Sequence, residues 1–300
     1  MVRRRAPAKI NLYLHVTGRR DDGYHLLESL IAFAGVEDVV EVEPGPDRGL
    51  ELTVAGPFAD ELAGSAGAGA GNIVLRAARA LARVAGREPD ASMRLVKNLP
   101  VAAGLGGGSA DAGAALRALA ALWEVRLPDE ELAALALGLG ADVPACLAGR
   151  PVLVSGIGET LRPAPALPPV HLLLVNPSVA LATADVFAAF EARTRASPPP
   201  LTDPPADAAA LAARLAERRN DLEDAARRLA PAIDAALGWL GGRSGCLLAR
   251  MSGSGATCFG LFADPEAARV AEEETRIAHP GWWARAAPLL AAREREEGWW

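Results

Sequence analysis

The chain contains, at residues 100–109, the stretch Pro-Val-Ala-Ala-Gly-Leu-Gly-Gly-Gly-Ser, followed by the alanine-rich run Ala-Asp-Ala-Gly-Ala-Ala-Leu-Arg-Ala-Leu over 110–119. Glycine permits positive φ and lets the backbone approach a ligand closely. We expect a helix that begins near Ser109, with Asp111 in its first turn. Its free N–H groups and the positive end of its dipole would point into the glycine loop. The stretch therefore predicts a phosphate-binding site.

This loop differs from the two common phosphate-binding motifs. No lysine follows Gly108, which excludes the pattern Gly-x-x-x-x-Gly-Lys-Ser/Thr. The spacing of Gly104, Gly106 and Ser109 lacks the third glycine of a dinucleotide-binding fingerprint. The segment 93–100 before the loop has the pattern of a strand, so the sequence predicts a strand–loop–helix phosphate site of another kind.

Lysine is rare in this chain. Of the 31 basic residues only Lys9 and Lys97 are lysines, which makes both candidates for positions where a compact ammonium is needed. Residues 8–16 alternate like a half-buried strand, with Lys9, Asn11, Tyr13 and His15 on one face. A lysine beside an asparagine could orient a substrate hydroxyl and stabilise developing negative charge.

Asp142 lies in the segment Gly-Leu-Gly-Ala-Asp-Val-Pro at 138–144. An aspartate before a proline and a short helix is most often a helix N-cap. The same carboxylate among small apolar residues could serve as a general base toward an alcohol, with a lysine keeping it ionised. The sequence leaves both interpretations of Asp142, helix cap and general base, open at this point.

Two further segments combine with the glycine loop. Asp-Asp-Gly-Tyr-His at 21–25 could be a turn over the core, or a ligand lid in which Tyr24 stacks and His25 forms hydrogen bonds. Met-Ser-Gly-Ser-Gly-Ala-Thr at 251–257 could be a tight turn between strands, or a second glycine loop that closes on substrate or phosphate. The residues of that second loop are Ser252, Gly253, Ser254 and Gly255.

Composition limits the classes of partner. The net charge of −6 argues against a nucleic acid or an anionic membrane as the main partner. No window offers 18 uncharged apolar residues, so no membrane span is expected. The three cysteines, Cys146, Cys246 and Cys258, have no paired or metal-binding spacing, which predicts reduced core residues and a cytoplasmic protein. No feature of the sequence sets an oligomeric state.

Predicted strands and helices intermix along the chain without repeats, which is typical of an α+β fold. The proline-rich segment 162–169 is the best candidate for a domain boundary. We therefore expect an N-terminal domain over 1–163 with the ATP-binding and catalytic residues, and a C-terminal domain over 164–300. Residues 291–300 are expected to form a frayed tail.

Taken together, three segments resemble the signature motifs of the GHMP small-molecule kinases. They are the loop 100–109, Ala-Lys-Ile-Asn at 8–11 and the late segment 251–257, in the correct order along residues 6–290. The resemblance implies a two-domain GHMP kinase fold, with an N-terminal domain like part of a ribosomal protein, a ferredoxin-like C-terminal domain and the site in the cleft. It implies ATP as the phosphoryl donor, with Mg²⁺ expected.

The segments 8–25, 139–144 and 155–159 make the resemblance more specific. They imply a small-molecule acceptor that carries a cytidine diphosphate, phosphorylated on the 2-hydroxyl of its methylerythritol part, in isoprenoid precursor synthesis by the non-mevalonate route. Asp142 would then be the base and Lys9 its partner. Asn11 and Thr183 would contact the polyol.

The resemblance also implies residues for the two nucleotide handles. Tyr24 and His25 would hold the cytosine, with Phe187 stacking on its other face or, alternatively, packing only in the core. The residues implied for ATP are Asn72, Lys97, Pro100, Gly104, Leu105, Gly106, Gly107, Gly108 and Ser109. No metal ligand is assigned, although Ser109 could contact the ion.

Two other functions remain open. The chain could be another GHMP kinase of the homoserine or mevalonate type, which would not require a nucleotide diphosphate on the acceptor. It could also be a non-catalytic member that binds a metabolite, a reading that loss of Lys9 or Asp142 would have favoured. Both residues are present.

Overall fold

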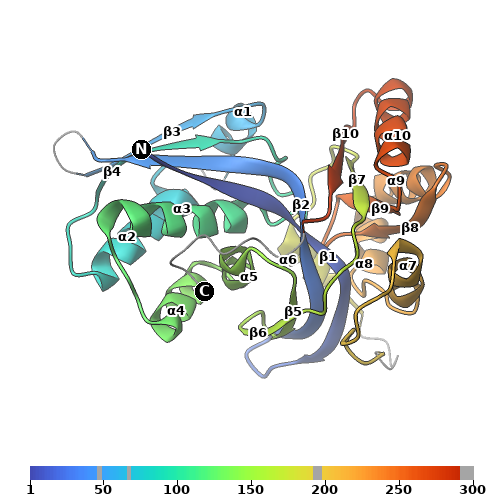
Figure 1. Cartoon of the computed structure of the whole chain (residues 1–300), viewed down its shortest axis with the longest axis horizontal. Helices are drawn as coiled ribbons and strands as arrows, with labels where there is room; N and C mark the ends of the chain where they lie inside the picture. The colour runs from blue at the N-terminus through green and yellow to red at the C-terminus, as the bar shows by residue number, and fades with distance from the viewer. Residues whose placement is uncertain (46–48, 66–68, 192–197, 291–300) are drawn as a thin grey trace. The chain divides into compact units, whose positions relative to one another are not determined.

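The structure is a computed structural model that describes residues 1–45, 49–65, 69–191 and 198–290 (Figure 1). Its strands are β1 (Val2–Arg19), β2 (His25–Glu43), β3 (Gly49–Ala55), β4 (Asp90–Val96), β5 (Val152–Gly156), β6 (Thr160–Pro163), β7 (His171–Asn176), β8 (Cys246–Met251), β9 (Cys258–Phe262) and β10 (Trp283–Pro288). Its α-helices are α1 (Ala59–Ala63), α2 (Ile73–Val84), α3 (Gly107–Trp123), α4 (Asp129–Leu139), α5 (Val143–Ala148), α6 (Thr183–Ala188), α7 (Ala208–Ala216), α8 (Glu223–Leu229), α9 (Ala232–Gly241) and α10 (Pro265–Ala278), and Gly69–Gly71 forms a 3₁₀ turn. The predicted α+β class is confirmed.

The chain divides into two compact units that are each discontinuous in sequence. The first unit comprises 1–8, 36–101 and 106–149, and the second comprises 9–35, 102–105 and 150–300. The long strands β1 and β2 contribute residues to both units. The predicted tail, 291–300, lies outside the described residues.

In the first unit, β3 pairs parallel with β4, and β4 pairs antiparallel with the second half of β2. Helices α2, α3, α4 and α5 pack against one another (Figure 1). The contact between α3 and α5 is close, because a Cβ added to Gly113 would lie 3.1 Å from the backbone N of Leu147. Alanine and glycine on α3 thus let the short helix α5, which follows Asp142, approach its backbone.

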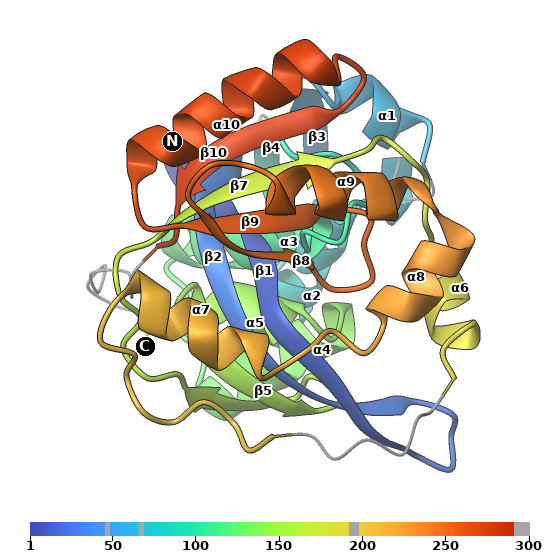
Figure 2. The same cartoon turned by 90° about the vertical axis from the view of Figure 1, so that its right-hand side faces the viewer.

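In the second unit, the first half of β2 pairs antiparallel with β5, and β5 pairs antiparallel with β6. The C-terminal sheet has the order β10-β7-β9-β8, with antiparallel neighbours throughout. Figure 2 shows α9 and α10 lying alongside these strands, which both helices contact. Because the four strands take the order fourth, first, third, second, this sheet has the predicted ferredoxin-like arrangement.

Two expectations about local structure need correction. Residues 6–15 of β1 are buried on both faces, so the prediction of a half-buried strand is wrong. On the polar face, the side chains of Lys9 and Asn11 hydrogen-bond to each other, and Asn11 also bonds to Ser29, which offsets the cost of burying them. Helix α3 begins at Gly107, after a left-handed Gly106, and this places Asp111 beyond the first turn.

None of the three cysteines forms a disulfide; Cys146 and Cys258 are buried, as predicted, whereas Cys246 is only half-buried. No helix within the described ranges is both long and apolar enough to cross a membrane.

Candidate active site

The first glycine loop, residues 104–109, leads directly into α3. Gly104 and Gly106 adopt positive φ values of 73° and 59°, which glycine tolerates without strain. Gly106 is the N-cap of α3 and no side chain caps the helix. The first N–H groups of α3 therefore remain available to an anion, with the positive end of the helix dipole behind them.

A buried ionic triad lies against the first residue of α3. Lys97 donates hydrogen bonds to Asp38 and, at 2.9 Å, to Asp111, and all three residues are at most 3% exposed. A Cβ added to Gly107 would lie 3.0 Å from the Lys97 ammonium, so a side chain at this position would crowd that ammonium. We define these residues, Lys97, Asp38 and Asp111, as the charged triad.

Asp38 also fixes the backbone that leads into the loop. Its carboxylate accepts hydrogen bonds from the backbone N–H groups of Asn98, at 2.5 Å, and Leu99, at 2.9 Å. The triad thus connects the end of β2, the segment after β4 and helix α3 through charge-assisted hydrogen bonds.

Burial and charge shift the ionisation of this triad in defined directions. Burial raises the pKa of Asp111 to about 7, with Asp38 adding to the rise and Lys97 opposing it. Burial disfavours the charged form of Lys97, but Asp111 and Asp38 outweigh it and raise the pKa of its ammonium. Lys97 thus remains cationic, while Asp111 titrates near neutrality.

Asn72 is a helix cap. Its side-chain oxygen accepts a hydrogen bond from the backbone N–H of Val74 at 2.9 Å, at the start of α2, and the residue is buried. This geometry satisfies one of the orphan donors of the helix. A contact between Asn72 and ATP remains a prediction.

Asp142 occupies the N-cap position of α5, but its side chain makes no capping hydrogen bond. The residue is half-buried. Arg117 on α3 holds the other end of α5 by donating to the carbonyl oxygens of Cys146 and Leu147 at 3.1 and 2.8 Å. The Asp142 side chain therefore does not cap α5, and its role as a general base remains a prediction.

In the second unit, Lys9 and Asn11 form a fixed pair on β1. The Lys9 ammonium donates to the Asn11 side-chain oxygen at 2.8 Å. The Asn11 amide donates to the hydroxyl of Ser29 at 2.8 Å, and that hydroxyl donates to the carbonyl of Tyr13 at 2.6 Å. This chain of bonds fixes the rotamer of Asn11 and, through it, the position of the ammonium.

The second glycine loop, residues 251–255, lies against this pair. The Ser252 hydroxyl accepts from the backbone N–H of Asn11 and donates to the carbonyl of Gly104, each at 3.2 Å. A Cβ on Gly253 would lie 3.2 Å from the Asn11 side-chain oxygen and 3.9 Å from the Lys9 ammonium. The hydroxyls of Ser254 and Thr183 are 2.8 Å apart. The structure thus brings together six predicted residues, Lys9, Asn11, Thr183, Ser252, Gly253 and Ser254, and the glycine that begins the first loop.

Two of the predicted base-binding residues, His25 and Phe187, lie in an aromatic cluster. The rings of His25 and Phe187 stack with centroids 5.2 Å apart and an interplanar angle of 24°, and Phe190 meets His25 edge-on at 5.6 Å. Tyr24 is 63% exposed. Phe187 is half-buried and packs against the core, so the core-packing interpretation is confirmed and its contact with cytosine remains a prediction. Burial and the nearby Arg19 lower the pKa of His25, which favours the neutral imidazole.

Two family models match this chain. The GHMP kinases N terminal domain matches residues 72–150, and the GHMP kinases C terminal region matches residues 205–279. A 4-diphosphocytidyl-2-C-methyl-D-erythritol kinase of Paramagnetospirillum magneticum is 52% identical over 286 residues, which is 95% of this chain and 98% of that protein. This chain belongs to the GHMP kinases. A kinase of the same name from Rhodospirillum rubrum is 52% identical, over 97% of this chain and 93% of its own length.

Solved structures agree with this membership. A crystal structure of 4-(cytidine 5'-diphospho)-2C-methyl-D-erythritol kinase matches with 38% identity and a TM-score of 0.77, over 96% of this chain and 98% of that one. A homoserine kinase from Cytophaga hutchinsonii matches with 18% identity and a TM-score of 0.73, over 98% of this chain and 95% of its own. At that identity the second likeness concerns the fold alone.

This GHMP kinase offers few acidic ligands for Mg²⁺. Within the described part of the chain, no group of three His, Cys, Asp or Glu side chains is placed to hold a metal ion. Mg²⁺ readily keeps several waters and binds through phosphates with one or two protein ligands. Mg²⁺ bound together with ATP, with Ser109 as a candidate contact, remains a prediction.

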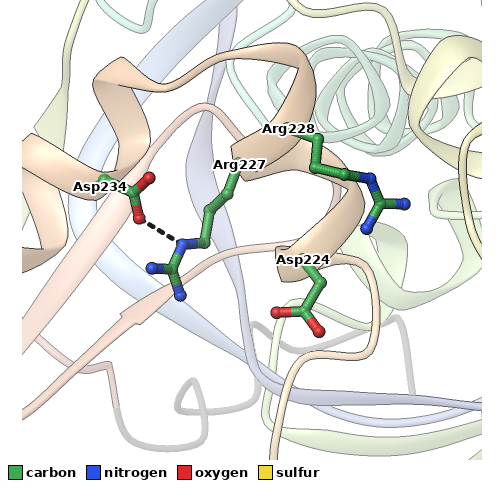
Figure 3. A pocket seen from close by; sticks show the side chains of 4 residues that line it. All are labelled: Asp224, Arg227, Arg228 and Asp234. Atoms are coloured by element: carbon green, nitrogen blue, oxygen red, sulfur yellow. Dashed lines mark hydrogen bonds and ion pairs between the residues drawn. The ribbon is translucent and has the colours of Figure 1, made fainter.

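A hollow on the surface of this GHMP kinase lies elsewhere. It measures about 430 Å³ and is lined by Asp224, Arg227, Arg228 and Asp234 of α8 and α9 (Figure 3). Arg227 pairs with Asp234, and Arg228 donates to the carbonyl of Ala189 at the end of α6 at 2.8 Å. Its charges balance and none of the predicted site residues lines it, so we assign it no part in the chemistry.

Sequence reasoning missed several residues of these networks. Asp38 lies in an ordinary strand pattern, and only its burial, at 0% exposure, reveals its part in the charged triad. Ser29 and Asn220 were missed because their partners lie far along the chain. Lys97, one of only two lysines, gives an indirect signal: if it is buried, its ammonium requires a buried carboxylate such as Asp38.

Proposed function

We propose that this chain is an ATP-dependent kinase that phosphorylates the 2-hydroxyl of 4-diphosphocytidyl-2-C-methyl-D-erythritol. The observation that carries the proposal is the 52% identity to kinases of that name over nearly the whole chain. The fixed Lys9–Asn11 pair and the uncapped start of α3 support it, because they supply the ammonium and the anion-binding helix end that phosphoryl transfer requires.

In this reaction the acceptor oxygen bonds to the γ-phosphorus of ATP, the bond to the leaving ADP oxygen breaks, and the hydroxyl proton passes to Asp142. Lys9 stabilises the developing alkoxide, and Asn11 and Thr183 orient the polyol. Mg²⁺, when bound with ATP, neutralises charge on the β- and γ-phosphates, with Ser109 as a candidate contact. Phosphoryl transfer needs little more than this positioning and charge stabilisation.

We assign the first glycine loop to the ATP phosphates, through Gly104, Gly106, Gly107, Gly108 and Ser109. Pro100, Leu105, Asn72 and Lys97 are proposed near the same nucleotide. The ammonium of Lys97 already bonds within the charged triad. We therefore expect Lys97 to favour ATP binding mainly by fixing Gly107 and the start of α3. A cytoplasmic location is part of this proposal, since ATP is the donor.

The cytosine is assigned to Tyr24, His25 and Phe187. His25 stacks on Phe187 in the free protein, so the base would have to insert beside or between these rings. The exposed Tyr24 is available to close on the second face of the base. Stacking on aromatic rings is worth roughly 1–3 kcal/mol per base, and this remote binding energy can align the hydroxyl.

The test is an assay of the purified protein with ATP, Mg²⁺ and 4-diphosphocytidyl-2-C-methyl-D-erythritol, following ADP release and the phosphorus spectrum of the product. We expect ADP and a new monophosphate on the 2-hydroxyl. The matched control is Asp142→Asn, which should bind ATP like the parent and lose most turnover.

Two results would overturn the proposal. Turnover of homoserine or mevalonate, with none of the cytidine-bearing alcohol, would keep the kinase and change the substrate. Binding of ATP without turnover of any of these alcohols would favour the non-catalytic reading.

A further inference from the structure

Asn220 is a buried asparagine between α7 and α8 that sequence reasoning did not single out. Its side-chain amide donates to the carbonyl of Met251 at 2.9 Å and to the carbonyl of Gly253 at 2.7 Å. Its side-chain oxygen accepts from the backbone N–H of Leu222 at 3.0 Å. The two amide hydrogens and the oxygen of Asn220 thus each have a backbone partner. Among short side chains, only asparagine offers two donors and an acceptor in this arrangement.

These bonds set the direction of one peptide group in the second glycine loop. In a trans peptide the C=O and N–H point in opposite directions. Because the carbonyl of Gly253 points at Asn220, the N–H of Ser254 points away from it. Within the described residues, the backbone N–H groups of Gly253 and Ser254 have no hydrogen-bond partner, although both residues are buried.

Unsatisfied buried N–H groups are rare in folded proteins and call for a partner. The surroundings of these two indicate an anion. Gly253 lies against the Lys9–Asn11 pair, and the Ser254 hydroxyl meets that of Thr183. The Lys9 ammonium on β1 and the two backbone donors of the second glycine loop together form the kind of concavity that binds phosphate oxygens.

We propose that Asn220 is a positioning residue, which holds the Gly253–Ser254 peptide so that the N–H groups of Gly253 and Ser254 bind a phosphoryl oxygen of the substrates. This deepens the proposed function and rests on it for the identity of the substrates. The phosphoryl oxygen could come from ATP or from the diphosphate of the acceptor, and the experiment separates the two.

The test compares Asn220→Leu with the parent protein. Leucine has nearly the shape of asparagine and no polar atoms, so it removes the three hydrogen bonds without adding charge. The matched control is Asn176→Leu, the same substitution at another buried asparagine of the same unit, which bonds to Thr257 and Ser178. Binding of ADP, CDP, adenosine and cytidine is measured for each protein by calorimetry or ligand-detected NMR.

We expect Asn220→Leu to lose roughly 10- to 100-fold affinity for ADP or for CDP, the range for one hydrogen bond to a charged group. Affinity for adenosine and cytidine should stay within about twofold, and Asn176→Leu should match the parent. A loss confined to ADP assigns the oxygen to ATP, and a loss confined to CDP assigns it to the acceptor.

Equal losses for nucleosides and nucleotides would overturn the proposal, because they would indicate a general structural defect. So would unchanged binding of both diphosphates. If Asn220→Leu does not fold, the parent protein labelled with ¹⁵N-glycine and ¹⁵N-serine gives a second measurement. The Gly253 and Ser254 amide signals should then move with ADP or CDP and not with nucleosides, and unmoved signals would overturn the proposal.

These readouts do not depend on turnover. Failure of the proposed function would appear as a parent protein that binds nucleotides but does not phosphorylate the cytidine-bearing alcohol. Failure of the inference about Asn220 would appear in binding alone.

Discussion

The two glycine loops of this kinase are supported by different chemistry. At the first loop, the start of α3 rests on the charged triad of Lys97, Asp38 and Asp111. The second loop is held by neutral groups, through the amide of Asn220 and the hydroxyl of Ser252. Both arrangements fix the backbone of a glycine loop, but one uses buried charge and the other uses ordinary hydrogen bonds.

The two loops differ in how much stability the protein should lose when a supporting side chain is removed. Buried charges are stable only together, because removing one partner leaves another without compensation. Neutral hydrogen bonds contribute about 1 kcal/mol each and can be removed singly at moderate cost. Substitution in the charged triad and changes of pH should therefore alter the free energy of unfolding strongly. Substitution of the groups that hold the second loop should alter it less, and with little dependence on pH.

The largest effect is expected for Lys97→Met. This change leaves the buried carboxylates of Asp38 and Asp111 together without their cation, which should lower the free energy of unfolding by about 3–5 kcal/mol. The control is Arg94→Met on β4, the strand that precedes Lys97; the partner of Arg94 is Glu41 in an exposed ion pair at 3.0 Å. That pair should be worth at most about 1 kcal/mol, and equal urea midpoints for the two variants would contradict the special cost of the triad.

An intermediate effect is expected for the pH dependence of stability. Burial raises the pKa of Asp111 from 3.8 to about 7, so the folded state binds this proton more tightly than the unfolded state. The contribution of Asp111 to stability is therefore fully present below pH 4 and is lost as the pH rises toward 7. Asp111→Asn removes this titration, so the variant should gain stability relative to the parent between pH 5 and pH 8.

Unfolding by urea at pH 5 and pH 8 measures this difference. Asp142→Asn serves as a control, since it also removes one carboxylate from the first unit and should leave the difference nearly as in the parent. If the free energy of unfolding changes equally between pH 5 and pH 8 in the parent and in Asp111→Asn, Asp111 does not titrate in this range.

The smallest effect is expected for Ser252→Ala in the second loop. The change removes a bond to the backbone N–H of Asn11 and another to the carbonyl of Gly104. Two neutral hydrogen bonds should cost about 1–3 kcal/mol, with little dependence on pH from 5 to 8. Ser178→Ala, which removes one exposed hydrogen bond to the carbonyl of Gly281, should cost less. A Ser252→Ala cost above that of Lys97→Met would reverse the comparison between the loops.

Local sequence predicted the parts of the site that depend on local conformation. Glycines at 104 and 106 and an alanine-rich run predicted the loop and α3. The start of α3 was placed two residues too late, because Gly106 ends the loop in a left-handed conformation and the helix begins directly after it. Turn and helix propensities act over a few residues, so such features can be derived from a short window.

The sequence by itself thus determined the α+β class and the glycine loop that leads into α3, and it predicted a phosphate site at that loop and catalytic roles for Lys9 and Asp142. Only the tertiary structure decided that Lys97 meets Asp38 across 59 positions and that Asn220 reaches Gly253 across 33. It also decided that the polar face of β1 is buried. The physical reason is that burial and long-range hydrogen bonds depend on where the chain returns in space, and no local preference encodes that return.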